Sequence, residues 1–288
     1  MFELLELKHY IENAEEITIN DQFKVKMSKE LYERYKTGEF DNYFYMLDTC
    51  IKEIDKLGIK YPGGAKPTYY VYMIPTDKAY MLQIPANFDT GRGGGRPVPS
   101  FERDGFPRAY GVTDNMCSNV DITDKKIISN IHELTHLVSN MFFTGSRYLS
   151  EGVSEAVPYY VMGMEEDYPE HSEMMAKFNE DIIIPVEKLK INGVFDSLTN
   201  MKIINNSSCT FRASYVSSYL AVAALLEKYK DKYGVSKEEA LQLFYDTLRG
   251  KNDSYYYEGI LCDQLGINPN TFCNETEYQK EYVRKLKR

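Results

Sequence analysis

Two histidines four residues apart constrain the fold of this chain more than any other feature. His132 and His136 bracket Glu133 in the run His-Glu-Leu-Thr-His, and the whole chain holds only 4 histidines. Around this run, apolar residues recur at the spacing of one helical face, at Ile127, Ile131, Leu134, Val138 and Met141. Thr123 or Asp124 is placed to cap the start of such a helix. We therefore predict a helix that buries one side and carries both imidazoles on another.

The spacing of the two histidines suits a metal ion. Side chains at positions i and i+4 lie on one face of a helix, as two ligands of a tetrahedral Zn²⁺ must. A catalytic zinc also needs a third protein ligand and one position left open for water. Ser139 and Phe142 stand where metzincins have glycine and histidine, so that class is excluded. Glu151 is the best candidate for the third ligand, and His171, in a turn-like acidic segment, is the alternative.

The segment around Glu151 carries a family resemblance. His-Glu-x-x-His followed by Tyr148-Leu149-Ser150-Glu151-Gly152-Val153-Ser154-Glu155 resembles the gluzincin metallopeptidases, including collagenase-like and aminopeptidase-like members. The resemblance implies that His132, His136 and Glu151 bind one Zn²⁺ and that Glu133 is the general base. It further implies that Glu155 orients a zinc-binding histidine through a hydrogen bond. The alternative is that Glu151 and Glu155 only solvate an exposed helix.

The resemblance continues more weakly as far as residue 233. It implies a helix that delivers a tyrosine to the oxyanion formed during peptide hydrolysis. Tyr215 is the first candidate and Tyr219, one turn later, is the second. With 25 tyrosines in the chain, a packing role remains the alternative for either residue. The substrate in this family lies antiparallel to an edge strand before the metal helix, and residues 109–120 are the candidate here.

One departure from the family concerns the substrate. Aminopeptidase-like members capture the substrate's amino group with a Gly-x-Met-Glu-Asn motif, whereas this chain has Gly111-Val112-Thr113-Asp114-Asn115. The glutamate is missing, so we expect an endopeptidase, although Asp114 could replace the amine anchor. Two other functions remain open: a non-catalytic zinc-bearing binding module of the same fold, and a zinc hydrolase of a non-peptide amide or ester.

The predicted fold class is α+β and zincin-like, with the active-site cleft between two subdomains. Residues 1–122 are expected to form a mixed α/β subdomain with a small sheet, and residues 123–288 a helical subdomain that holds the metal ligands. Periodicity and turn residues predict the elements. Strands are expected within 16–27, at 69–74, at 79–84 and as a pair within 110–122, and helices at 40–57, 150–162, 212–233, 236–248 and 275–286. Residues 86–108, rich in glycine and proline, are expected to be a loop, of which 90–99 could close over the cleft.

Composition limits the partners and the compartment. A net charge of −9 argues against a nucleic-acid binder. The expected partner is a peptide or protein substrate, as the gluzincin resemblance implies. No apolar run approaches the roughly 20 residues that span a bilayer.

The first ten residues lack the apolar core of a signal peptide, so the protein is intracellular or its leader is missing from the sequence. Its tyrosine and asparagine content slightly favours a secreted or cell-envelope protein. The 5 cysteines form no C-x-x-C pair and are expected to be ordinary thiols, with a Cys262–Cys273 bridge as the alternative.

Overall fold

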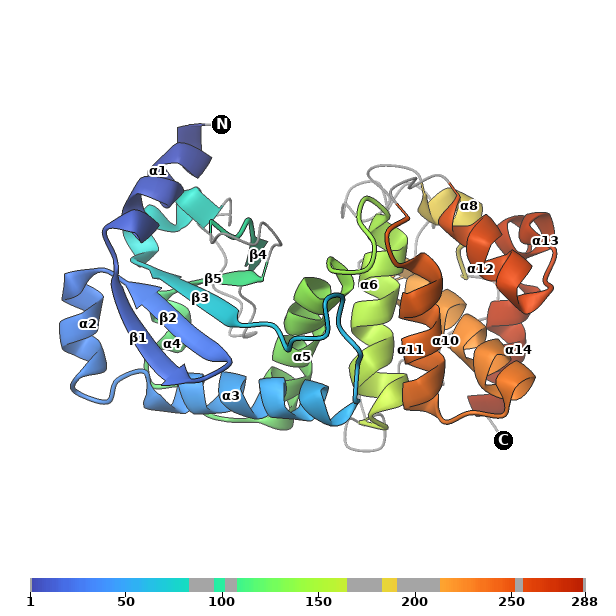
Figure 1. Cartoon of the computed structure of the whole chain (residues 1–288), viewed down its shortest axis with the longest axis horizontal. Coiled ribbons are helices and arrows are strands. Elements are labelled where there is room, and N and C mark those ends of the chain that lie inside the picture. The colour runs from blue at the N-terminus through green and yellow to red at the C-terminus, as the bar shows by residue number, and fades with distance from the viewer. Residues whose placement is uncertain are drawn as a thin grey trace. The chain divides into compact units, whose positions relative to one another are not determined.

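The structure is a computed structural model that describes residues 2–82, 96–101, 108–164, 183–190, 213–251 and 256–286. The chain divides into two compact units, residues 1–141 and 142–288. The first unit holds a five-stranded sheet with helices, and the described part of the second is helical apart from one isolated bridge (Figure 1). The α+β class expected from the sequence is therefore confirmed.

The strand order of the sheet is β1-β2-β3-β5-β4. β1 (Glu15–Asn20) and β2 (Phe23–Met27) form an antiparallel hairpin, as expected within 16–27. β3 (Tyr69–Ile74) runs parallel to β2 and has the predicted bounds, and β5 (Ala109–Thr113) runs parallel to β3. β4 (Arg96–Val98) pairs antiparallel with β5 at the end of the sheet.

Three expectations for this region are corrected. The strand expected at 79–84 is wrong, because a 3-10 helix, η1 (Thr76–Leu82), buries the adjacent residues Met81 and Leu82. The strand pair expected within 110–122 is only one strand, since α4 (Asp114–Cys117) follows β5 at once. The stretch 86–108 is not wholly a loop, because it supplies β4. Apolar alternation over so few residues cannot separate strand from helix, and the pairing of β4 with β5 is a long-range contact.

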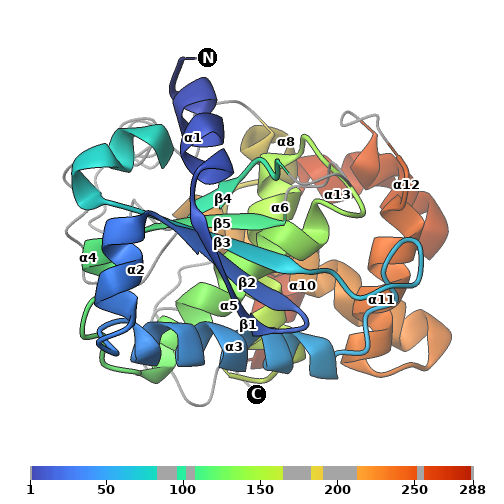
Figure 2. The same cartoon turned by 60° about the vertical axis from the view of Figure 1, so that its left-hand side comes forward.

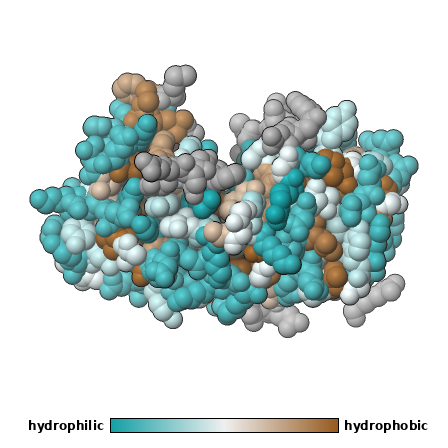
Figure 3. Space-filling model, in the orientation of Figure 1, coloured by the Kyte–Doolittle hydropathy of each residue, from teal (hydrophilic) through white to brown (hydrophobic). Residues whose placement is uncertain are grey.

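One face of the sheet is covered by α1 (Phe2–Glu12) and η1. Leu7 and Ile11 of α1 pack in one apolar cluster with Tyr72 and Ile74 of β3 and with Ala109 of β5. Near its N-terminus, α1 leaves apolar side chains exposed to solvent (Figure 3). Phe2 is 73% and Leu5 is 63% exposed. The sequence analysis assigned no helix here.

The opposite face of the sheet is covered by α3 (Asp41–Lys56) and α5 (Asp124–Ser139). Phe23 of β2 and Phe44 of α3 meet edge to face, with ring centroids 6.1 Å apart. Tyr110 of β5 donates a hydrogen bond to Oδ1 of Asn130 on α5 at 3.2 Å. Figure 2 shows α3 running along this side of the sheet, as Figure 1 does. Because α5 packs on the sheet and on α3, it belongs to the first unit, and the boundary lies after Met141 rather than at the expected residue 122.

The second unit is built around α10 (Ala213–Tyr233), which packs against α6 (Arg147–Ala156), α11 (Lys237–Leu248), α12 (Tyr257–Leu265) and α14 (Glu277–Leu286). α6 continues into a π-helical turn, η2 (Val157–Val161). The short helices α8 (Val186–Leu189) and α13 (Pro269–Asn274) complete the described part. Helices expected at 212–233, 236–248 and 275–286 are confirmed within two residues; the one expected at 150–162 begins three residues earlier.

Cys262 and Cys273 are free buried thiols, so the bridge considered from the sequence is not formed. Burial raises the pKa of Cys262 to about 12 and that of Cys273 to about 11, which keeps both thiols protonated near neutral pH. Cys209 lies outside the described residues. No helix in the described parts of the chain has both the length and the apolar character needed to cross a bilayer.

Candidate metal centre

α5 forms where the sequence predicts it and for the expected reason. The hydroxyl of Thr123 accepts a hydrogen bond from the Lys126 N–H at 3.4 Å and so caps the helix. Ile131, Leu134 and Val138 are buried, whereas His132, Glu133 and His136 are only half-buried. The helix therefore separates an apolar side from a side that carries ionisable groups.

The two histidines of α5 lie at the separation that a shared metal ion requires. Their Nε2 atoms are 3.2 Å apart, and their ring centroids are 4.9 Å apart with the ring planes at 83°. In a tetrahedral site with Zn–N bonds of about 2.05 Å, two nitrogen ligands lie about 3.3 Å apart. The pair thus fits two adjacent ligands of one zinc ion.

α6 carries Glu151 and Glu155 on one half-buried side of the helix. Between them, Gly152 faces α10 at very short range: a β-carbon at Gly152 would lie 2.5 Å from the carbonyl oxygen of Ser218 and 2.7 Å from Cγ2 of Val222. Tyr148 and Val153 are buried as well. The Glu-Gly pair of the motif therefore has a physical basis, since glycine lets α6 approach α10 while the half-buried glutamates lie on another side of the helix.

The structure brings together the three side chains that the sequence analysis assigned to the metal. His132, His136 and Glu151 each offer one ligand atom, and these atoms all lie within 4.8 Å of one another. Two imidazole nitrogens and one carboxylate oxygen are a donor set that Zn²⁺ accepts. The carboxylate of Glu151 also lies near a basic side chain: Nε of Arg147 is 3.7 Å from Oε1 of Glu151. The sequence analysis did not single out Arg147, although its i, i+4 spacing to Glu151 is a signal for an ion pair.

The connection between α5 and α6 is held by a buried tyrosine. The hydroxyl of Tyr257 accepts a hydrogen bond from the Thr144 N–H at 3.3 Å and lies 2.7 Å from the carbonyl oxygens of both Thr144 and Lys251. Phe143 also forms an isolated parallel bridge with Lys251. This contact fixes the backbone three residues before α6 begins. No pattern in the sequence links Tyr257 with Thr144, because they lie 113 positions apart.

The other expected site residues have different surroundings. Tyr215 is half-buried in the first turn of α10. Tyr219 is fully buried, and its hydroxyl shares a hydrogen bond with the hydroxyl of Tyr282 at 3.2 Å, so it is committed to the core. Glu155 is half-buried one turn after Glu151, and its hydrogen bond to a metal-binding histidine stays a prediction. His171, the alternative ligand, lies outside the described residues, as does most of the 90–99 stretch.

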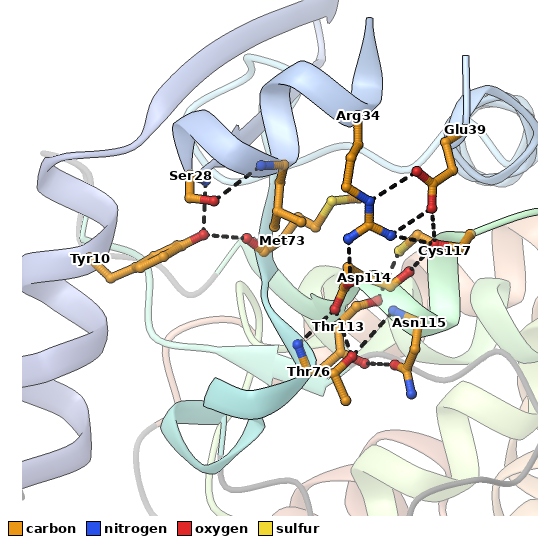
Figure 4. A network of polar contacts seen from close by, with 12 residues as sticks. Tyr10, Ser28, Arg34, Glu39, Met73, Thr76, Thr113, Asp114, Asn115 and Cys117 are labelled. Carbon is orange, nitrogen blue, oxygen red and sulfur yellow. Dashed lines mark hydrogen bonds and ion pairs between the residues drawn. The ribbon is translucent and has the colours of Figure 1, made fainter. Parts of the chain in front are cut away.

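Asp114 has a structural role, which argues against its use as an amine anchor. Its Oδ2 pairs with Arg34 at 2.5 Å, and its Oδ1 accepts hydrogen bonds from the backbone N–H and the hydroxyl of Thr76 at 2.7 and 2.6 Å (Figure 4). Burial raises the pKa of Asp114, but the hydrogen bonds from Thr76 and Arg34 bring it below its ordinary value. Both carboxylate oxygens therefore have partners in the fold.

Arg34 also binds Glu39, through Nε at 2.9 Å and Nη2 at 2.6 Å. This two-pronged contact, with a further hydrogen bond from Ser118, lowers the pKa of Glu39 to about 2. The network ties α2 (Lys29–Tyr35) to α4 within the first unit (Figure 4).

The expected substrate strand is also corrected. β5, the strand within 109–120, is not an edge strand, because β3 and β4 pair with its two sides. The edge on that side of the sheet belongs to β4, which the sequence analysis placed in a loop. A peptide that added to this side of the sheet would therefore pair with β4.

No model of a known protein family matches the chain, and no curated protein matches it in sequence. The gluzincin resemblance thus depends on the motif residues themselves.

Proposed function

We propose that this chain is a zinc-dependent metallopeptidase of the gluzincin type that acts as an endopeptidase. The observation that supports it most directly is the group of His132, His136 and Glu151, whose ligand atoms lie within 4.8 Å of one another. Three protein ligands of this kind leave one of four zinc positions open for water, which is the arrangement of catalytic rather than structural sites.

Each residue of the group would have a distinct task. Bound Zn²⁺ would polarise the peptide carbonyl and lower the pKa of water to about 7. Glu133, which follows His132 directly, would accept a proton from the attacking water and deliver it to the leaving amine. Tyr215 would donate a hydrogen bond to the oxyanion, and Glu155 would orient a metal-binding imidazole.

The endopeptidase assignment is supported by the first unit. An aminopeptidase needs an accessible carboxylate for the substrate's amino group, and both oxygens of Asp114 are already bound by Arg34 and Thr76. A substrate without a free amino group at the scissile residue does not need that anchor. Its backbone could pair with an edge strand, as extended peptides do in many complexes.

The test is the variant Glu133→Gln, which removes the base and keeps the size of the side chain. Metal content should equal that of the wild type, while cleavage of casein and of a peptide library should fall by a factor on the order of 10²–10⁴. The matched control is Glu12→Gln, which changes an exposed carboxylate on α1 that pairs with Lys8. This control should change neither metal content nor cleavage. Mass spectrometry of the products should locate the cleaved bonds inside the peptides.

Four outcomes would contradict the proposal. Undiminished cleavage by the Glu133→Gln variant would reject the mechanism, and wild-type protein that takes up no zinc would reject the site. A zinc-loaded wild type that hydrolyses only esters or non-peptide amides would indicate the non-peptide hydrolase. Zinc bound by four protein ligands without any hydrolysis would indicate the binding module.

A further inference from the structure

Arg147 lies one helical turn before Glu151 on α6 and is the cation beside the candidate third ligand. Its Nε is 3.7 Å from Oε1 of Glu151. The Glu151 side chain is only 13% exposed, whereas the Arg147 side chain is 54% exposed. The Glu151 side chain is therefore largely removed from water, while the positive charge near it is half-exposed.

The Arg147–Glu151 ion pair contributes little to the stability of α6. Helix ion pairs at i, i+4 are weak, and the order with the basic residue first is the less favourable one. A carboxylate removed from water nevertheless needs a positive charge or hydrogen bonds nearby. Arg147 supplies such a positive charge on a planar group that suits a carboxylate.

The guanidinium of Arg147 and a bound metal ion would both interact with the carboxylate of Glu151. A carboxylate can bind a metal through one oxygen or through both. If both oxygens of Glu151 bound a zinc ion that already has two histidines, they would fill the position that a catalytic site leaves to water. A guanidinium 3.7 Å from one oxygen opposes that arrangement by its attraction for this oxygen, and its charge also repels the metal ion.

We propose that Arg147 is a positioning residue of the metal centre, which keeps one oxygen of Glu151 away from the ion and so limits the carboxylate to single-oxygen ligation. This inference rests on the proposed function, because it requires that His132, His136 and Glu151 bind a metal. It assigns Arg147 two measurable effects: it weakens metal binding, and it keeps the coordination number low.

The experiment compares the wild type with Arg147→Ala, Arg147→Gln, Arg147→Lys and the control Arg284→Ala. Arg284 pairs with Glu277 on α14 at 2.8 Å and is 50% exposed, so its removal takes the same charge from an exposed helix of the same unit. Zinc affinity is measured by competition with a chelator. Coordination is measured by visible absorption after Co²⁺ loading, because four-coordinate Co²⁺ absorbs more strongly than five-coordinate Co²⁺.

Arg147→Ala should bind zinc about 3- to 10-fold more tightly than the wild type, as expected for loss of one nearby charge in a partly exposed site. Its Co²⁺ bands should weaken, because the freed oxygen joins the ion. Arg147→Gln keeps the length of the side chain and should behave in the same way even if truncation disturbs α6. Arg147→Lys retains the charge and should restore both wild-type values, and Arg284→Ala should match the wild type.

Equal affinity and equal spectra for the wild type, Arg147→Ala and Arg147→Gln would overturn the inference and leave the proposed function intact. Weaker zinc binding by both uncharged variants would also overturn it, because Arg147 would then hold the ligand in place for the ion. Failure of the wild type and of Arg284→Ala to bind either metal would reject the proposed function itself, and with it the role of Arg147.

Discussion

Gly152 of α6 packs so closely on Ser218 of α10 that a β-carbon at Gly152 would lie 2.5 Å from the Ser218 carbonyl oxygen. Backbone atoms cannot move aside as a flexible side chain can. The contact lies directly after Glu151, so the packing of α6 on α10 also determines where the candidate third ligand lies within the second unit. The glycine of the motif is thus explained by helix packing.

Gly152→Ala should lower the free energy of unfolding by about 1–3 kcal/mol, since the added methyl group must push α6 and α10 apart. Urea denaturation measures the change. Gly259→Ala is the matched control, because Gly259 lies inside helix α12 and a β-carbon added there would meet nothing within 4 Å. The control should gain about 0.5–1 kcal/mol from the better helix propensity of alanine. Equal changes in the two variants would contradict the packing argument.

If the proposed zinc site is correct, zinc should stabilise the protein, and removing one candidate histidine ligand should abolish that stabilisation. At a zinc concentration of 100 times Kd, a ligand that binds only the folded state adds about 2.7 kcal/mol to the free energy of unfolding, so the wild-type Tm should rise on zinc addition. His136→Ala should lose that rise. His9→Ala, an exposed histidine of α1, should keep it. A zinc-dependent Tm in His136→Ala would place the metal elsewhere.

The two candidate tyrosines should respond differently to loss of the hydroxyl. Tyr215→Phe should lower kcat by a factor on the order of 10²–10³ with metal content and stability unchanged, as expected for an oxyanion donor. Tyr219→Phe removes the hydrogen bond to Tyr282, and the free energy of unfolding should fall by about 1–3 kcal/mol while kcat is retained. Kinetics and urea denaturation of both variants measure this. The reverse pattern would make Tyr219 the oxyanion donor.

The Arg34–Glu39 contact should make the protein acid-sensitive. The pKa of Glu39 is lowered from 4.5 to about 2, so its carboxylate stabilises the fold fully above pH 4.5 and loses that contribution as the pH falls through about 2. Glu39→Gln should therefore be less stable than the wild type at pH 7, and its stability should fall less steeply between pH 4.5 and 2.

Free energies of unfolding measured across this pH range test the prediction. Glu33→Gln, in an exposed pair with Lys36, should keep the wild-type slope. Some acid sensitivity should remain in Glu39→Gln, because Asp114 also has a lowered pKa. A slope in Glu39→Gln as steep as that of the wild type would show that the contact carries no pH dependence.

Tyr257→Phe should loosen the connection that leads into α6. In this variant the Thr144 N–H loses its acceptor, and the carbonyl oxygens of Thr144 and Lys251 lose the hydroxyl donor. The free energy of unfolding should therefore fall by about 1–3 kcal/mol. Hydrogen exchange at the Thr144 amide should become faster. Tyr256→Phe, whose side chain is 66% exposed, should change neither quantity. Unchanged exchange in Tyr257→Phe would mean that other contacts hold this backbone.

Local sequence patterns and turn residues predicted the helices α3, α5, α10 and α11 and the strands β1, β2 and β3 close to where they appear. Burial is periodic in α3, α5 and β2, whereas α10 is buried on nearly all sides. The pattern failed where a short segment is held by distant partners. η1 buries two adjacent residues against α1, which an alternating pattern cannot indicate, and β4 contains a proline and pairs only because β5 lies beside it.

In the candidate site, too, some residues were predictable from local patterns and others depend on distant partners. Its histidine pair was predictable because helical periodicity alone puts His132 and His136 on one face, whereas Glu151 required a family motif. The commitment of Asp114 to Arg34 was not predictable, since those residues are 80 positions apart. Spacing placed Tyr215 ahead of Tyr219, but only the structure showed that Tyr219 is fully buried and Tyr215 half-buried.

By itself, the sequence determined an amphipathic helix capped by Thr123 or Asp124, with the two imidazoles off its apolar stripe, because both depend on the 3.6-residue repeat of a helix. Only the tertiary structure decided that Glu151 lies near those imidazoles, that β5 is an interior strand and that Asp114 is held by the fold. These depend on packing between segments far apart in the chain, where close approach, charge and hydrogen bonding select among arrangements that no local pattern can distinguish.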